Sequence, residues 1–122
     1  MRTANDPRHR RRQELIQELF KVEFHDQPVK AEAKQIIDQQ AFLDEQIQQA
    51  AKEFPIEKIN RVDLAILRLA VYELLIEKKE PVNVIIDEAI ELAKEFSGPT
   101  SPSFINGALG NIVKHENISK VS

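Results

Sequence analysis

Hydrophobic residues recur at three- and four-residue intervals along most of the chain, and short polar segments separate these stretches. This spacing is typical of amphipathic helices, and no segment requires a β-strand. The first helix is predicted from Pro7 to Phe24, with Asp6 as N-cap and Pro7 at the first helical position. A second helix is predicted from Val29 to Glu53, with a narrow, glutamine-rich apolar stripe, and it ends where Phe54 precedes a proline.

The third predicted helix is the most hydrophobic one, and it runs from Asn60 to Ile76. Asn60 can cap it, and Asp63 follows at the spacing of a capping box. A helix that is apolar on nearly every face belongs in the centre of a fold. Within it, Arg68 is expected either to extend its charge to solvent or to pair with a carboxylate.

Two further helices complete the predicted fold. The fourth covers Val82 to Phe96, and its acidic residues are expected on the solvated side opposite its apolar face (Asp87, Glu88, Glu91 and Glu95). The last begins with Ser101 as N-cap and Pro102 at the first helical position. The pattern therefore predicts an all-α protein with one helical domain over residues 7–116, a disordered arm over 1–6 and a frayed tail over 117–122.

The amino-acid composition excludes several kinds of functional site. The chain has no cysteine, which excludes a disulfide framework, a thiolate zinc site and a cysteine nucleophile. Its three histidines are not spaced as metal ligands, and it has no phosphate-binding glycine loop. We therefore expect no metal, no cofactor and no enzymatic activity. No apolar run is long enough to span a membrane and no signal peptide is recognisable, so a cytoplasmic location without membrane association is expected.

The charge distribution is strongly asymmetric. Residues 1–12 carry a net charge of +4, whereas the remaining residues carry −7. On a helix, Arg8, Arg11 and Arg12 share about a third of the circumference, and Arg10 lies to the side. Like charges at this spacing repel, and the dipole of a helix disfavours cations in its first turns. A polyanionic partner such as RNA would compensate both effects, although a charge run of this kind can also simply be solvated.

The last helix contains two features with alternative interpretations. Gly107 lies within it at a cost of about 1 kcal/mol relative to alanine, which close helix–helix packing could explain. Phe104 lies near its start, where a phenylalanine can either join the core or stack on an unpaired base.

Four segments of the chain together match the pattern of one known family, namely residues 60–75 (NRVDLAILRLAVYELL), 86–96 (IDEAIELAKEF), 104–109 (FINGAL) and 41–44 (AFLD). They resemble the NusB family of transcription antitermination factors, the first segment its central helix and the second its next helix. Residues 104–109 (FINGAL) are similar to the family's F-V-N-G-V-L signature, and residues 41–44 (AFLD) to its A-Y-L-D. The basic run before Leu19 resembles the family's start, with Phe20 where tyrosine is usual.

This resemblance implies an antiparallel bundle of about five main helices that binds boxA-like single-stranded RNA. It also implies partnership with NusE, the ribosomal small-subunit protein, in the RNA polymerase antitermination complex on ribosomal RNA operons. In the family, the first helix and the start of the last helix help form the RNA surface. Carried over by position, the RNA-binding residues would be Arg8, Arg10, Arg11, Arg12, Phe20, Ser101 and Phe104.

The chain also departs from the family pattern. Between Phe20 and Phe42 it is shorter than usual, by roughly one helix with its loop, so the family's second helix is expected to be missing. That loss would expose Ile36, Ile37 and the first helix, unless a partner or a homodimer covers them. Pro102 and Ser103 replace a commonly basic or polar pair. The alternative function is therefore a NusB-like protein-interaction or dimerisation domain without specific RNA binding.

Overall fold

Helices make up most of the described residues, which in this computed structural model are 6–22, 30–116 and 118 of the 122-residue chain. The α-helices are α1 (Pro7–Val22), α2 (Ala31–Asp38), α3 (Gln40–Ala50), α4 (Arg61–Tyr72), α5 (Val82–Phe96) and α6 (Ser101–His115). A 3-10 turn, η1 (Ile56–Lys58), precedes α4, and a π-helical turn, η2 (Glu73–Glu77), follows it. None of the described residues lies in a strand, so the all-α prediction is confirmed.

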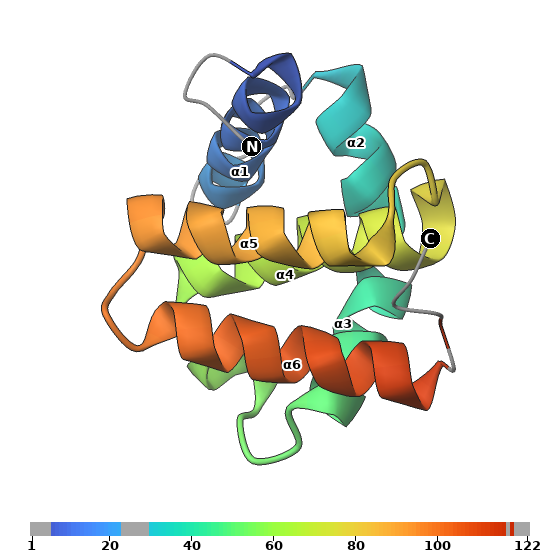
Figure 1. The fold of residues 1–122 in the computed structure, drawn as a ribbon, viewed down its shortest axis with the longest axis vertical. Coiled ribbons are helices and arrows are strands. Elements are labelled where there is room, and N and C mark those ends of the chain that lie inside the picture. Colours follow the sequence, from blue (N-terminus) through green and yellow to red (C-terminus); the bar gives the residue numbers. More distant parts are fainter. Residues whose placement is uncertain (1–5, 23–29, 117, 119–122) are drawn as a thin grey trace.

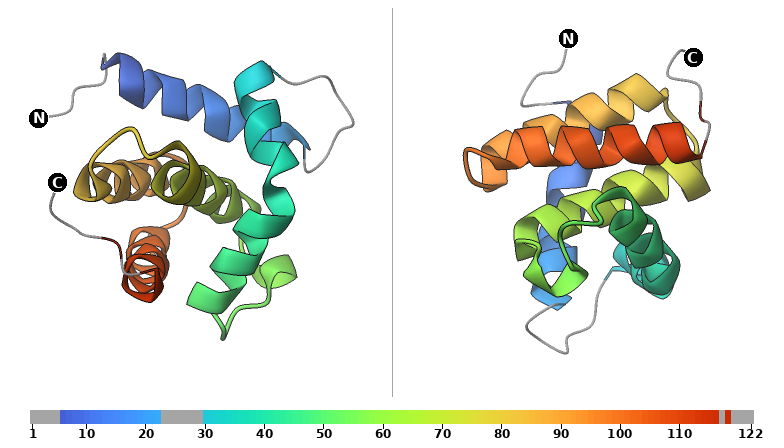
Figure 2. Two further views of the ribbon diagram at one scale, coloured as in Figure 1. Left: turned by 90° about the vertical axis from the view of Figure 1, so that its right-hand side faces the viewer. Right: turned by 90° about the horizontal axis from the view of Figure 1, so that it is seen from below.

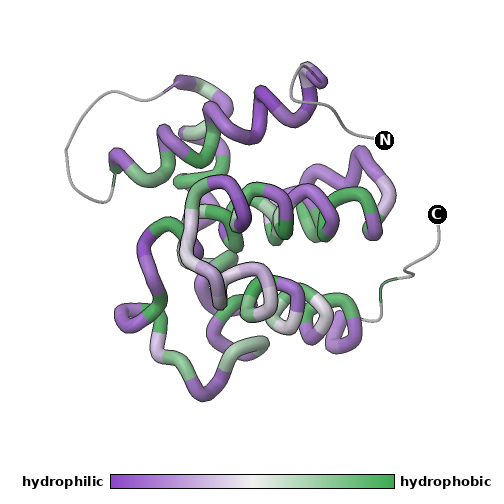
Figure 3. The backbone as a smooth tube through the Cα atoms, turned by 60° about the vertical axis from the view of Figure 1, so that its left-hand side comes forward, coloured by the Kyte–Doolittle hydropathy of each residue, from purple (hydrophilic) through white to green (hydrophobic). Residues whose placement is uncertain are grey.

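Helix α4 lies at the centre, as its all-round hydrophobicity predicts. Every residue from Asp63 to Val71 is buried, and α4 packs against the other five α-helices. Figure 1 shows α5 in front of α4 with α6 below, and Figure 2 shows α1 on the opposite side of α4 and α5 from α6. In Figure 3 the start of α1 is hydrophilic, and hydrophobic residues appear only in its second half, where Leu15, Ile16 and Leu19 enter the core.

Polar contacts hold α3 against α4 and cap the start of α4. The guanidinium of Arg68, which is only 6% exposed, donates to both carboxylate oxygens of Asp44 on α3, at 2.8 and 2.9 Å. This ion pair is one of the two arrangements expected for Arg68. At the other end of α4, Asn60 accepts hydrogen bonds from the backbone amides of Val62 and Asp63, so the predicted N-cap is confirmed.

The predicted capping role of Asp63 and the predicted N-cap role of Ser101 are both wrong, and for one reason. The carboxylate of Asp63 accepts hydrogen bonds from the hydroxyls of Ser97 at 2.6 Å and Ser101 at 2.9 Å. These contacts join the start of α4 to the α5–α6 connection. Ser101 is consequently a buried first residue of α6, and Thr100 occupies the N-cap position.

The continuous second helix predicted from Val29 to Glu53 is also wrong, because the structure has two helices there. Gln39, with φ −100° and ψ 10°, separates α2 from α3. The bend lets α2 pack along α1 while α3 packs against α4 and α6. As a result Ile36 is buried and Ile37 is partly buried, which contradicts the expected exposure of Ile36 and of the apolar face of the first helix.

The ends of the other helices mostly agree with the sequence. Helix α5 has the predicted bounds, and Asp6 caps α1 by accepting from the backbone amide of Arg8 at 2.9 Å. Ile118 packs on the core. Several predictions fall outside the described residues. They are the rest of the predicted arm and tail, the end of the first helix at Phe24, and part of the segment between Phe20 and Phe42 in which the family's second helix was expected to be missing. No helix in the described ranges combines the length and the apolar character needed to cross a bilayer.

Candidate nucleic-acid interface

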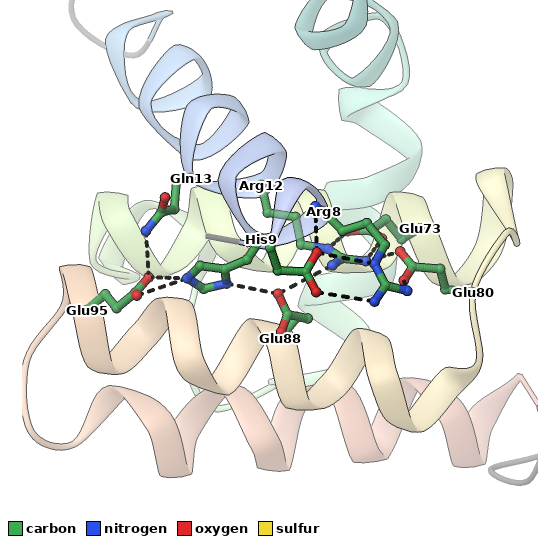
Figure 4. A network of polar contacts seen from close by, with 9 residues as sticks. Arg8, His9, Arg12, Gln13, Glu73, Glu80, Glu88 and Glu95 are labelled. Atoms are coloured by element: carbon green, nitrogen blue, oxygen red, sulfur yellow. Dashed lines mark hydrogen bonds and ion pairs between the residues drawn. The ribbon is translucent and has the colours of Figure 1, made fainter. Parts of the chain in front are cut away.

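The first two turns of α1 rest on a buried cluster of carboxylates instead of projecting freely into solvent (Figure 4). Arg12 is the centre of this cluster and is 2% exposed. Its Nε and Nη2 donate to the two oxygens of Glu73 at 2.9 and 2.6 Å, and Nη2 also contacts Glu80. Its Nη1 donates to Glu88 at 3.4 Å. Arg12 therefore fastens α1 to both the end of α4 and α5.

His9 extends the same cluster along α5. Its Nδ1 lies 2.9 Å from an oxygen of Glu88, and its Nε2 lies 2.9 Å from an oxygen of Glu95. An ionised carboxylate can only accept, so with both glutamates ionised the two contacts are hydrogen bonds when both ring nitrogens carry protons, which makes the ring a cation. Burial lowers the pKa of His9, but the hydrogen bonds and charges of Glu88 and Glu95 outweigh burial and raise that pKa above its ordinary value of 6.5.

The burial of Glu88 corrects the prediction that it lies on a solvated face. Glu88 is 2% exposed because α1 covers that side of α5. Its neighbours His9 and Arg12 supply the positive charge that makes a buried carboxylate tolerable. Asp87, in contrast, is exposed as predicted.

The remaining arginines of α1 differ in how much of their charge is available. Arg11 is partly buried, donates to Glu77 at 2.9 Å and contacts Glu32 of α2. Arg8 keeps 65% of its side chain exposed while it contacts Asp6 and Glu80. Arg10 is exposed, and its side chain forms no ion pair with any residue that the structure describes. Arg8 and Arg10 thus present accessible guanidinium groups at the start of α1.

The sequence already indicated which of these arginines is buried. Arg12 precedes Leu15, Ile16 and Leu19 by three, four and seven residues, so it lies on the buried stripe of the helix. The carboxylates Glu73, Glu77 and Glu80 come from the end of the central helix and the turn after it. There the backbone widens into η2, with the Lys78 amide donating to the carbonyl of Glu73 at 2.9 Å and Lys78 itself left-handed at φ 55°. That π-turn was not foreseen.

The other predicted site residues are not gathered around these arginines. Phe20 is partly buried near the end of α1, whereas Ser101 and Phe104 lie on α6, on the far side of α4 and α5 (Figure 2). Ser101 is buried against Asp63. Phe104 is partly exposed, and its ring meets that of Phe54 edge to face, with centroids 5.1 Å apart and an interplanar angle of 72°. Among the described residues no cluster of His, Asp or Glu could hold a metal ion.

Comparison with known proteins decides the family. The family model described as NusB family matches residues 25–114. The chain belongs to the NusB family. The transcription antitermination protein NusB of Chloroflexus aggregans is 36% identical over an alignment of 129 positions, gaps included, which covers 87% of this chain and 86% of that protein.

Further members of the family agree with this assignment. The NusB of Clostridium botulinum (strain Kyoto / Type A2) is 47% identical over 85 residues, which cover 70% of this chain and 59% of that relative. The solved structure of T. maritima NusB superimposes with a TM-score of 0.76 at 33% identity, and the match covers 93% of each chain. The fold of the family is therefore present over nearly the whole chain.

Proposed function

We propose that this chain is an RNA-binding adaptor of transcription antitermination, which binds boxA-like single-stranded RNA together with the ribosomal protein NusE. The observation that carries the proposal is the pair of accessible arginines, Arg8 and Arg10, on the first helix of a NusB-family fold. Arginine binds phosphate through two parallel donors and stacks on bases, so this surface suits single-stranded RNA. The relatives named above carry the name transcription antitermination protein, which supports the same role.

The burial of Arg12 separates the predicted RNA-binding residues into those that position a helix and those that can contact RNA. Its guanidinium would have to leave Glu73, Glu80 and Glu88 to reach a phosphate, so we assign it to positioning α1. Arg8 and Arg10 then make the phosphate contacts, with Arg11 at the edge of the surface. Ser101 likewise positions the start of α6, through Asp63.

One observation favours the alternative, a protein-interaction or dimerisation domain without specific RNA binding. Carboxylates of the chain itself already pair with Arg8, Arg11 and Arg12, which reduces the positive charge offered to RNA. The two functions differ in how binding depends on salt. Each phosphate contact contributes about −0.7 to the slope of log K against log salt for a single strand.

The test is a fluorescence-anisotropy titration of boxA-like RNA and a scrambled oligonucleotide, with and without NusE, at several salt concentrations. We expect tighter binding of the boxA-like sequence. Arg10→Ala should weaken binding and reduce the steepness of the salt slope by about 0.7. Gln17→Ala, an exposed site later on the same helix, is the control. Equal binding of the two oligonucleotides under all conditions would refute specific recognition and favour the alternative.

A further inference from the structure

A small cavity lies beside the phenylalanine pair, on the face of the molecule formed by α3 and α6. It has a volume of 220 Å³, and its walls include Phe54, Phe104, Ala51 and Gly107. Phe54 is 46% exposed, which is unusual for a ring whose contact with Phe104 is otherwise typical of an interior pair. The cavity is thus open to solvent and has an aromatic wall.

The loop that carries Phe54 is held in place by a side chain of α3. The amide of Gln48 donates to the carbonyl of Phe54 at 2.9 Å, and its carbonyl oxygen accepts from the backbone amide of Ile56 at 3.0 Å. Gln48 thereby ties both sides of Pro55 to the helix. The aromatic wall is consequently preorganised and does not need to form when a ligand arrives.

Gly107 is one of the α6 residues that line the cavity, and the fold itself does not require a glycine there. A Cβ built on Gly107 meets no atom within 4 Å, and its φ is negative. Close helix–helix packing, the first explanation for this residue, is therefore wrong. Alanine would favour the helix more strongly. The absent side chain instead leaves the cavity open beside Phe104.

A larger groove adjoins the cavity, and its walls carry two lysines and one glutamate among other polar side chains. The groove has a volume of 710 Å³ and shares Ala50, Lys52, Glu53 and Asn111 with the cavity. Exposed Lys52 and Lys114 line it together with several amide side chains. An aromatic platform beside a basic groove matches how proteins hold single-stranded nucleic acid, with a base on the ring and phosphates near the cations.

We propose that the cavity between Phe54, Phe104 and Gly107 holds one unpaired base of the RNA, and that the Lys52–Lys114 groove carries the adjoining phosphates. This inference rests on the RNA binding proposed above and extends it to residues that sequence reasoning did not select, namely Phe54, Gly107, Lys52 and Lys114. A base can stack on Phe54 because 46% of that residue is exposed while its ring is held in an edge-to-face pair with Phe104.

The experiment compares two glycine variants of the same helix. Gly107→Leu fills the cavity, whereas Gly110→Leu adds the same side chain at a position that does not line the cavity or the groove. A Cβ at either position meets nothing within 4 Å, so Gly107→Ala and Gly110→Ala should melt at or above the wild-type temperature, and the melting temperature of each leucine variant is measured alongside them. If leucine at 107 perturbs the fold, Gly107→Ala and Phe54→Ala provide the same comparison.

Affinity for labelled boxA-like RNA is the readout. Gly107→Leu and Phe54→Ala should each lower it by about five- to 150-fold, the effect of losing one stacked base, whereas Gly110→Leu should leave it unchanged. If Arg10→Ala weakens RNA binding but the cavity variants do not, the proposed base site is refuted while the proposed function stands. The groove would then be a site for a protein segment instead of RNA. If the wild type binds no RNA at all, both proposals are overturned.

Discussion

The buried position of Arg12 gives the sharpest prediction about stability. In Arg12→Met the apolar stem is largely kept, but Glu73 and Glu88, each 2% exposed, lose their hydrogen bonds to the guanidinium. Removing one partner of a buried ion pair typically costs about 3–5 kcal/mol, because a charge is left without compensation. A domain of this kind has about 5–15 kcal/mol of total stability, so the variant should be severely destabilised.

The assay is urea unfolding followed by circular dichroism, with Arg10→Met as the matched control. Arg10 is exposed on the same turn of α1, so its substitution should change the free energy of unfolding by no more than about 0.5 kcal/mol. For RNA affinity we expect the opposite order of the two variants, because Arg10→Met removes an accessible guanidinium from a protein that stays folded. Adding Glu73→Gln to Arg12→Met should recover part of the lost stability, since it removes the uncompensated charge.

Two results would refute this reasoning. If Arg12→Met were as stable as Arg10→Met, Arg12 would not hold α1 in place and could be free to contact RNA. If Glu73→Gln made the double variant still less stable, the buried carboxylate would not be the source of the cost.

Three further predictions concern the other polar contacts. The stability of the fold should decrease as the pH rises from 6.5 through the raised pKa of His9, because the folded state binds the protonated ring more strongly. In His9→Gln the melting temperature should depend less on pH over that range. An unchanged pH dependence would contradict the cationic pairing of His9 with Glu88. Asp44→Asn should cost about 1–3 kcal/mol in urea unfolding by weakening the hold on buried Arg68, and a neutral effect would mean that other contacts of Arg68 suffice. Asn60→Ala should lower the free energy of unfolding by about 1 kcal/mol in the same assay, whereas Asn60→Asp, which can still accept the cap hydrogen bonds, should not. Equal stability of the alanine variant and the wild type would show that these bonds do not matter.

The helices were predictable from the sequence because burial in this fold follows a helical period. The all-round apolar run of α4 predicts its central place, and α5 has the predicted bounds. The break at Gln39 was not predictable in this way, since no proline or glycine marks it and only the packing of α2 and α3 on different neighbours requires it.

The site was harder to predict, because an arginine can serve a phosphate or a carboxylate equally well. The positive charge of residues 1–12 was visible, but the carboxylates that meet Arg12 are Glu73, Glu80 and Glu88, more than sixty positions later. Only the position of Arg12 on the same stripe as Leu15 and Leu19 hinted at its burial. No sequence pattern indicated that Phe54 lies against Phe104, since their proximity depends on how α3 and α6 pack.

The carboxylates beneath α1 have a kinetic consequence. Because Arg11 and Arg12 are paired internally, the field that an approaching RNA meets at long range is mainly that of the whole chain, whose net charge is −3. For the proposed RNA binding we therefore expect capture by contacts made after collision, without steering from a distance. The association rate constant should lie near the unsteered range of about 10⁵–10⁶ M⁻¹s⁻¹ and vary little with ionic strength, so that salt acts mainly by hastening dissociation.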